Sequence, residues 1–175
     1  MPTSYLSNDR IYLRAVEPED LDIFYRMEND PALWEISSFT MPYSRYALTQ
    51  YIENLVNDIY TDKQLRFMIV RRNDHAVLGA IDLTDFVPLH SRAAVGVALL
   101  EEYRGNGYAK DALSLLCDYA FGFLRMKQLY THIPIDNEAS RSLFGKSGFQ
   151  DCGIMKAWLQ VGKAYKDVVM MQLIR

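Results

Sequence analysis

The chain has 175 residues, 50% of them hydrophobic, and a formal net charge of −3 at pH 7. This length and composition predict one globular domain over residues 1–175 with a single sizeable core. The slightly acidic balance argues against a general nucleic-acid binder, which carries a basic surface.

Neither a membrane anchor nor a metal site is expected. The first ten residues, MPTSYLSNDR, contain no apolar segment typical of a signal peptide. No apolar run approaches the ~20 residues that span a membrane. Cys117 and Cys152 form no CxxC motif or Cys/His cluster, so we expect reduced thiols in a cytoplasmic protein and no zinc.

The first third of the chain predicts one strand and two helices. Residues 10–16 (RIYLRAV) alternate as a strand does. Residues 17–30 carry Pro18 and acids in a first helical turn and stop before Pro31. Residues 45–60 (RYALTQYIENLVNDIY) place apolar side chains on one face and predict a single amphipathic helix.

The remainder predicts mainly strands. Strands are expected at residues 64–72, 76–86, 92–100 and 127–135, with a hairpin at Asn73-Asp74-His75. Helices are expected at residues 108–124 and 137–149, and a terminal hairpin surrounds Gly162. The order β-α-α-β-β-β-α-β-α-β-β, rich in hairpins, predicts an α+β (mixed α/β) fold rather than a doubly wound sheet.

A glycine-rich turn, EEYRGNGYAK, joins a predicted strand to a predicted helix. A helix N-terminus directs free N–H groups and the positive end of its dipole toward the solvent. Gly105 and Gly107 allow close backbone approach, and Arg104 and Lys110 add positive charge. The turn therefore predicts a phosphate or pyrophosphate site, although an ordinary glycine turn with solvated cations has the same composition.

Two common phosphate motifs fit this turn poorly. It lacks the G-x-x-x-x-G-K-[ST] pattern of a P-loop. Gly105 and Gly107 match the first two glycines of a dinucleotide-binding G-x-G-x-x-G, but Lys110 occupies the third position. Asp136, after the next strand, resembles the ribose-binding acid of that motif, so a nucleotide-binding oxidoreductase remains an alternative.

The pattern Arg104-x-x-Gly107-x-Ala109 resembles the pyrophosphate-binding motif of the GNAT (Gcn5-related) N-acetyltransferases. A second segment, NEASRSLFGKSGF at residues 137–149, is similar to another motif of that family. The closing GKAYKDVVMMQLI resembles the subgroup of spermidine/diamine and ribosomal-protein acetyltransferases. The resemblance implies a central, mostly antiparallel, splayed sheet of about seven strands flanked by about four helices.

The resemblance also implies acetyl-CoA as cosubstrate, without a metal. Backbone groups of Val97, Ala98 and Leu99 would meet the pantetheine arm and the thioester carbonyl. Asn137 and Ser140 would contact CoA, although Asn137 is also suited to cap a helix. The full set of expected cofactor-binding residues is Val97, Ala98, Leu99, Arg104, Gly105, Asn106, Gly107, Tyr108, Ala109, Lys110, Asn137, Ser140 and Phe144.

Phe144 departs from the family pattern. Many members carry a tyrosine here that protonates the leaving thiolate, which phenylalanine cannot do. A thiol with a pKa of about 8.5 is a fair leaving group without help. Otherwise Tyr108, Tyr130 or Ser140 supplies the proton, or the protein binds acetyl-CoA with little turnover.

The sequence also leaves more than one candidate for the general base. Polyamine-acetylating relatives use an acid where this chain has Ala94. Asp82, Asp85 and Glu35 are the expected catalytic acids, although Asp82 and Asp85 also suit solvent-facing strand positions. His132 is a further candidate, since an ordinary histidine pKa of about 6.5 suits a base.

These observations predict an acetyl-CoA-dependent N-acetyltransferase acting on a primary amine, with a polyamine or diamine as substrate. A protein N-terminus is the alternative acceptor, and a low-turnover acetyl-CoA-binding module is the alternative function. Many relatives dimerise, so a homodimer is a further expectation.

Overall fold

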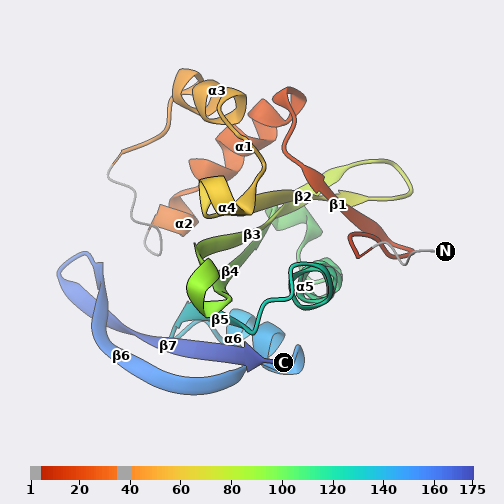
Figure 1. Cartoon of the computed structure of the whole chain (residues 1–175). Coiled ribbons are helices and arrows are strands. Elements are labelled where there is room, and N and C mark those ends of the chain that lie inside the picture. Colours follow the sequence, from red (N-terminus) through yellow and green to blue (C-terminus); the bar gives the residue numbers. More distant parts are fainter. Residues whose placement is uncertain (1–4, 35–40) are drawn as a thin grey trace.

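A computed structural model describes residues 5–34 and 41–175. One seven-stranded sheet runs through it in the order β1-β2-β3-β4-β5-β7-β6 (Figure 1). The strands are β1 (Ile11–Ala15), β2 (Leu65–Arg71), β3 (Val77–Val87), β4 (Arg92–Leu99), β5 (Gln128–Pro134), β6 (Gln150–Val161) and β7 (Ala164–Ile174). Neighbouring strands are antiparallel, except for the parallel pair β4 and β5. The predicted α+β class and the mostly antiparallel sheet are confirmed.

Helices pack against both faces of this sheet. They are α1 (Leu21–Glu28), α2 (Pro31–Trp34), α3 (Arg45–Glu53), α4 (Ile59–Asp62), α5 (Tyr108–Asp118) and α6 (Glu138–Lys146). Single 3-10 turns precede α1, precede β4 and follow β4, at Pro18–Asp20, Pro88–His90 and Glu101–Tyr103. A π-helical turn, Tyr119–Phe123, extends α5.

Side chains of β2 alternate between the two faces of the sheet, and each face has its own hydrophobic core. Phe67 and Ile69 pack with α5, α6 and β7, while Met68 and Val70 pack with α1 and α3. Successive side chains of a strand point to opposite faces, so one central strand supports both cores. None of the helices in residues 5–34 and 41–175 has both the length and the hydrophobicity of a membrane-spanning segment.

The single helix predicted over residues 45–60 is wrong. Helix α3 ends at Glu53, and α4 starts afresh after Asp58, whose side chain accepts a hydrogen bond from the N–H of Tyr60. Asn57 takes a positive φ of 58° between them. Asparagine and aspartate compete with helix formation by capping and by adopting left-handed conformations. The helical spacing of apolar residues therefore continues through Asn57 and Asp58, although the helix itself does not.

Candidate active site

Strands β4 and β5 part after a short stretch of pairing. On one edge β4 pairs with β3 from Ala94 to Leu99, but on the other edge it pairs with β5 only from Arg92 to Ala94. Beyond Ala94, the β4 backbone therefore faces an opening instead of a partner strand. The expected splay is present, and the polar backbone groups there are available to a ligand.

A cavity of about 530 Å³ opens at this fork. Six of the predicted cofactor-binding residues line it: Val97, Ala98, Leu99, Arg104, Asn137 and Ser140. The Asn137 side chain accepts a hydrogen bond from the N–H of Ser140 at 3.1 Å and so caps α6. The capping role of Asn137 is therefore confirmed, and its side chain also lies at the cavity wall.

The glycine turn continues from Arg104 beyond the lining of this cavity. Gly105 and Gly107 adopt positive φ values of 76° and 83°, and Gly107 is the N-cap of α5. The first backbone hydrogen bond of α5 is from Asp111 to Gly107, at 3.1 Å. The N–H groups of the first turn, at Tyr108, Ala109 and Lys110, have no helical partner by geometry. Asn106 lies between the two glycines.

Phe144, another of the predicted cofactor-binding residues, lies away from this cavity. Its side chain is 3% exposed and packs edge-on against Phe149, with ring centroids 5.0 Å apart. It belongs to the hydrophobic core and is not among the residues that line the cavity.

A second cavity of about 640 Å³ adjoins the first. The two share Leu33, Val97 and Ala98. Charged and titratable side chains border the second cavity: Glu28, Arg66, Asp82, Asp85 and His132. Two of the three predicted acids therefore come together here; the third, Glu35, lies outside the described residues.

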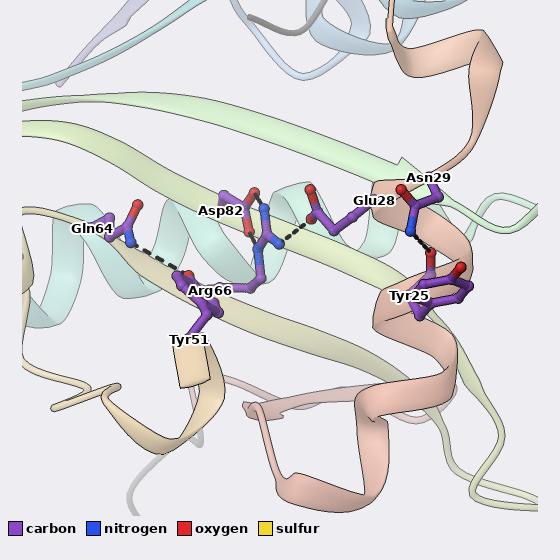
Figure 2. A network of polar contacts seen from close by, with 7 residues as sticks. All are labelled: Tyr25, Glu28, Asn29, Tyr51, Gln64, Arg66 and Asp82. Carbon is purple, nitrogen blue, oxygen red and sulfur yellow. Dashed lines mark hydrogen bonds and ion pairs between the residues drawn. The ribbon is translucent and has the colours of Figure 1, made fainter. Parts of the chain in front are cut away.

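Asp82 belongs to an ion-pair network that Figure 2 shows from close by. Arg66 donates from Nε and Nη2 to the two carboxylate oxygens of Asp82, both at 2.8 Å, and from Nη1 to Glu28. The three side chains are only 15–23% exposed. Burial opposes the charge of Arg66, but Asp82 and Glu28 outweigh burial and raise the pKa of Arg66. Two carboxylates around one guanidinium leave the network with a net charge of about −1.

Sequence patterns do not identify Glu28 or Arg66. Glu28 ends α1 and Arg66 lies near the start of β2, 38 positions away in the chain. Two arginines, Arg66 and Arg71, flank the apolar residues of LRFMIVR. Arg66 was a usable sign, because a half-buried arginine needs an acidic partner.

Asp85 sits at a β-bulge. The register of β3 and β4 shifts between Thr84 and Val87, and Asp85 has a positive φ of 49°. Bulges redirect side chains and often occur beside active sites. Asp85 lies close enough to Tyr130 to affect it: burial, and then the charge of Asp85, raise the pKa of Tyr130.

Metal binding has little support from the described part of the chain. No group of three or more His, Cys, Asp or Glu residues within residues 5–34 and 41–175 is placed to hold a metal ion. The expectation of a metal-free reaction stays a prediction.

The family model for the acetyltransferase (GNAT) domain matches residues 10–150. The chain belongs to this family. A spermidine N(1)-acetyltransferase of Vibrio cholerae is 24% identical over 168 residues, which cover 96% of this chain and 95% of the relative. The predicted family and its acetyltransferase class are confirmed.

Solved structures of GNAT members share the fold. Spermidine N-acetyltransferase from Vibrio cholerae in complex with CoA and spermine has a TM-score of 0.84 at 23% identity, covering 95% of this chain and 96% of that one. A dodecameric structure of the Vibrio cholerae enzyme has a TM-score of 0.81 at 24% identity, covering 95% of each chain.

Replacing Arg66 by methionine should destabilise the protein strongly. Loss of one partner of a buried ion pair costs about 3 kcal/mol, because the remaining charges stay desolvated. Urea unfolding of the wild type and the variant measures this.

The matched control is Arg45→Met. Arg45 pairs with Asp22, but their side chains are 55% and 80% exposed. An exposed pair contributes less than about 1 kcal/mol. Equal losses of unfolding free energy in the two variants would contradict a structural role for the Arg66 network.

Proposed function

We propose that the protein transfers the acetyl group of acetyl-CoA directly to a primary amine of a polyamine or diamine. The observation that carries this proposal is the meeting of two different cavities at Val97 and Ala98. One continues to a helix N-terminus suited to a pyrophosphate. The other is bordered by acids suited to a cation. The related Vibrio cholerae enzyme with CoA and spermine supports this assignment of donor and acceptor.

The charge of the second cavity favours a cationic acceptor. Arg66 offsets one of the carboxylates of Glu28 and Asp82, and Asp85 adds an exposed carboxylate. The cavity thus has more negative than positive charge. A polyamine carries several ammonium groups, so one can bind the acids while another reacts.

The reacting amine must first lose a proton. At an ordinary lysine-like pKa of about 10.4, deprotonation at pH 7 costs about 4.6 kcal/mol. Both carboxylate oxygens of Asp82 accept hydrogen bonds from Arg66. We therefore assign Asp82 to attracting the cationic substrate rather than to taking its proton. Asp85 has no ion pair or hydrogen bond within the described residues and is our proposed base, ahead of Glu35 and His132.

The acyl transfer then needs a donor for the developing oxyanion. The amine nitrogen attacks the thioester carbon, forming a C–N bond and an oxyanion that backbone N–H groups between Val97 and Leu99 would stabilise. Collapse breaks the C–S bond, and the sulfur leaves with the electron pair. The attacking nitrogen, positively charged after it bonds to carbon, gives up one proton to become the amide, and the leaving sulfur takes up one proton to become the thiol. Of the three substitutes for the missing tyrosine, Ser140 lines the first cavity; Tyr108 and Tyr130 do not.

Two alternatives remain distinct from this proposal. A protein N-terminus carries the same attacking group, and a low-turnover acetyl-CoA-binding module would need no proton donor in place of Phe144. Cys117 and Cys152 are free thiols, consistent with the reducing cytoplasm in which we place the reaction.

Release of CoA thiol from acetyl-CoA should depend on the amine supplied. Spermidine and putrescine should support turnover, whereas a short peptide with a free N-terminus should not. The assay is thiol release, with mass spectrometry of the acetylated product. Turnover with the peptide alone would assign the other acceptor class. Acetyl-CoA binding by calorimetry without turnover on any amine would favour the binding module.

Asp85→Asn should lower kcat for spermidine by about 100-fold if Asp85 takes the amine proton. Asparagine keeps the size of the side chain and tolerates the positive φ at this position. Asp22→Asn, which removes an exposed carboxylate on α1, is the control and should leave kcat unchanged. An unaltered kcat in Asp85→Asn would return the role to Glu35 or His132.

We propose a homo-oligomer, with the β6–β7 hairpin as its contact arm. The hairpin curves away from the body in Figure 1, and β6 is an edge strand with mostly exposed residues. Ile154, Trp158 and Tyr165 are 51–60% exposed. A long edge strand with apolar side chains favours pairing with another chain. The dodecameric relative supports a second copy as the occupant.

A bulge in this hairpin holds Trp158 outward. The β6–β7 register shifts between Met155 and Leu159, and Ala157 has a positive φ of 49°. Asp167 accepts from the N–H of Ala157 and from Nζ of Lys156, both at 2.8 Å. The exposure of Trp158 is thus part of a fixed backbone conformation.

Sedimentation should find the wild type as a dimer or larger, and Trp158→Glu should shift it to smaller species, because a charge in an apolar contact is costly. Tyr46→Glu, at another aromatic residue that is 75% exposed, should leave the mass unchanged. A monomeric wild type would exclude the contact.

A further inference from the structure

The glycine turn needs something to hold its shape. Residues Arg104 to Gly107 are exposed, so packing does little to fix them. The Arg104 side chain ties the start of the turn to β4 by donating from Nε to the carbonyl of Leu99 at 3.0 Å. Beyond Arg104, the Asn106 side chain donates to the carbonyl of Arg104 at 3.0 Å, a contact that moves with the turn. An anion site built from backbone N–H groups binds well only when those groups are already oriented.

Arg10, the residue immediately before β1, supplies a second anchor from outside the turn. Its Nη2 donates to the carbonyl of Asn106 at 2.7 Å, and its Nη1 donates to the carboxylate of Asp111 at 2.7 Å. The guanidinium also lies over the ring of Tyr108, 4.7 Å from its centroid. One side chain thus contacts the residue between the two glycines, the first residue of α5 and its first turn.

The base of this anchor is itself fixed. The N–H of Arg10 donates to Oδ1 of Asn8 at 2.9 Å, and its carbonyl accepts from the N–H of Arg72 at 2.9 Å. Arg10 is thereby tied to the sheet before its side chain reaches the turn. The planar guanidinium fork suits two acceptors at once, which a lysine ammonium does not reproduce.

Arg10 also offsets a negative charge close to the proposed pyrophosphate site. Asp111 lies in the first turn of α5, the same end that would receive a pyrophosphate. An uncompensated carboxylate there would repel the ligand. The ion pair with Arg10 offsets that charge.

We propose that Arg10 is a positioning residue for acetyl-CoA, holding the turn from Arg104 to Lys110 in its anion-binding form and neutralising Asp111. This inference rests on the proposed acetyl-CoA function. Arg10 touches the turn and α5 and has no assigned role in the chemical step. Its removal should therefore weaken donor binding and leave kcat at saturating donor unchanged.

The test compares Arg10→Met with Arg175→Met. Arg175 is a matched control because it pairs with Asp118 near the other end of α5 and lies over the ring of Phe121. Arg10→Met should raise the Kd for acetyl-CoA by calorimetry about tenfold, as expected when a preorganised site is loosened. Arg175→Met should leave it unchanged.

Two further measurements separate positioning from general damage. S-acetylpantetheine has the thioester and the pantetheine arm but no pyrophosphate, so its kcat/KM should be the same in wild type and Arg10→Met. Adding Asp111→Asn to Arg10→Met should recover part of the lost acetyl-CoA affinity, because the exposed carboxylate is removed. In the ligand-free protein, amide hydrogen exchange at residues 105–110 should be faster in Arg10→Met than in the wild type, and should be unchanged in Arg175→Met.

Three results would overturn the inference. They are an unchanged Kd for acetyl-CoA in Arg10→Met, an equal loss with S-acetylpantetheine, or unchanged exchange in the turn. Any of these in a protein that binds acetyl-CoA refutes the role of Arg10 and leaves the proposed function intact. A wild type that binds no acetyl-CoA refutes both.

Discussion

The candidate active site depends on one constraint: the pairing between β4 and β5 ends early, at Ala94 of β4. A parallel pair normally continues because every unpaired backbone group in a protein interior is costly. Here β4 remains bonded to β3 up to Leu99, while its other edge is free beyond Ala94. The opening brings α6, the glycine turn and the end of α1 to one place, and both cavities depend on it.

Charge is distributed unequally around this opening. The first cavity is lined by Arg104 and Lys166 against one acid, Asp136, and continues toward the N-terminus of α5. The second is bordered by Glu28, Asp82 and Asp85 with one arginine, Arg66. A donor with phosphates and an acceptor with ammonium groups would thus each meet the opposite charge. The same arrangement explains why ion pairs matter here: Arg66 offsets the charge of one of the two carboxylates that it binds, and Arg10 offsets the charge of Asp111.

Local patterns predicted most elements well, with failures of a specific kind. The alternating and apolar strand segments, the hairpin at His75 and the cap at Asn137 depend on neighbouring residues only, and they were predicted correctly. The helix over residues 45–60 failed because Asn57 and Asp58 broke the chain where the apolar spacing continued. Contacts distant in sequence, such as Arg10 with Asn106 or Arg66 with Glu28, leave no periodic sign.

The amino-acid sequence by itself determined the order of the elements, the anion-suited turn and, through its motifs, the family, because glycine conformations, helix ends and side-chain alternation are local properties. Through family resemblance it also predicted that Val97, Ala98, Leu99, Asn137 and Ser140 contact acetyl-CoA, and the structure brings these five residues to one cavity. Only the tertiary structure decided that Asp82 is bound by Arg66, that Phe144 lies in the core and that Arg10 reaches the turn. These facts depend on which strands and helices become neighbours, and that is settled by packing of the whole sheet rather than by any one segment.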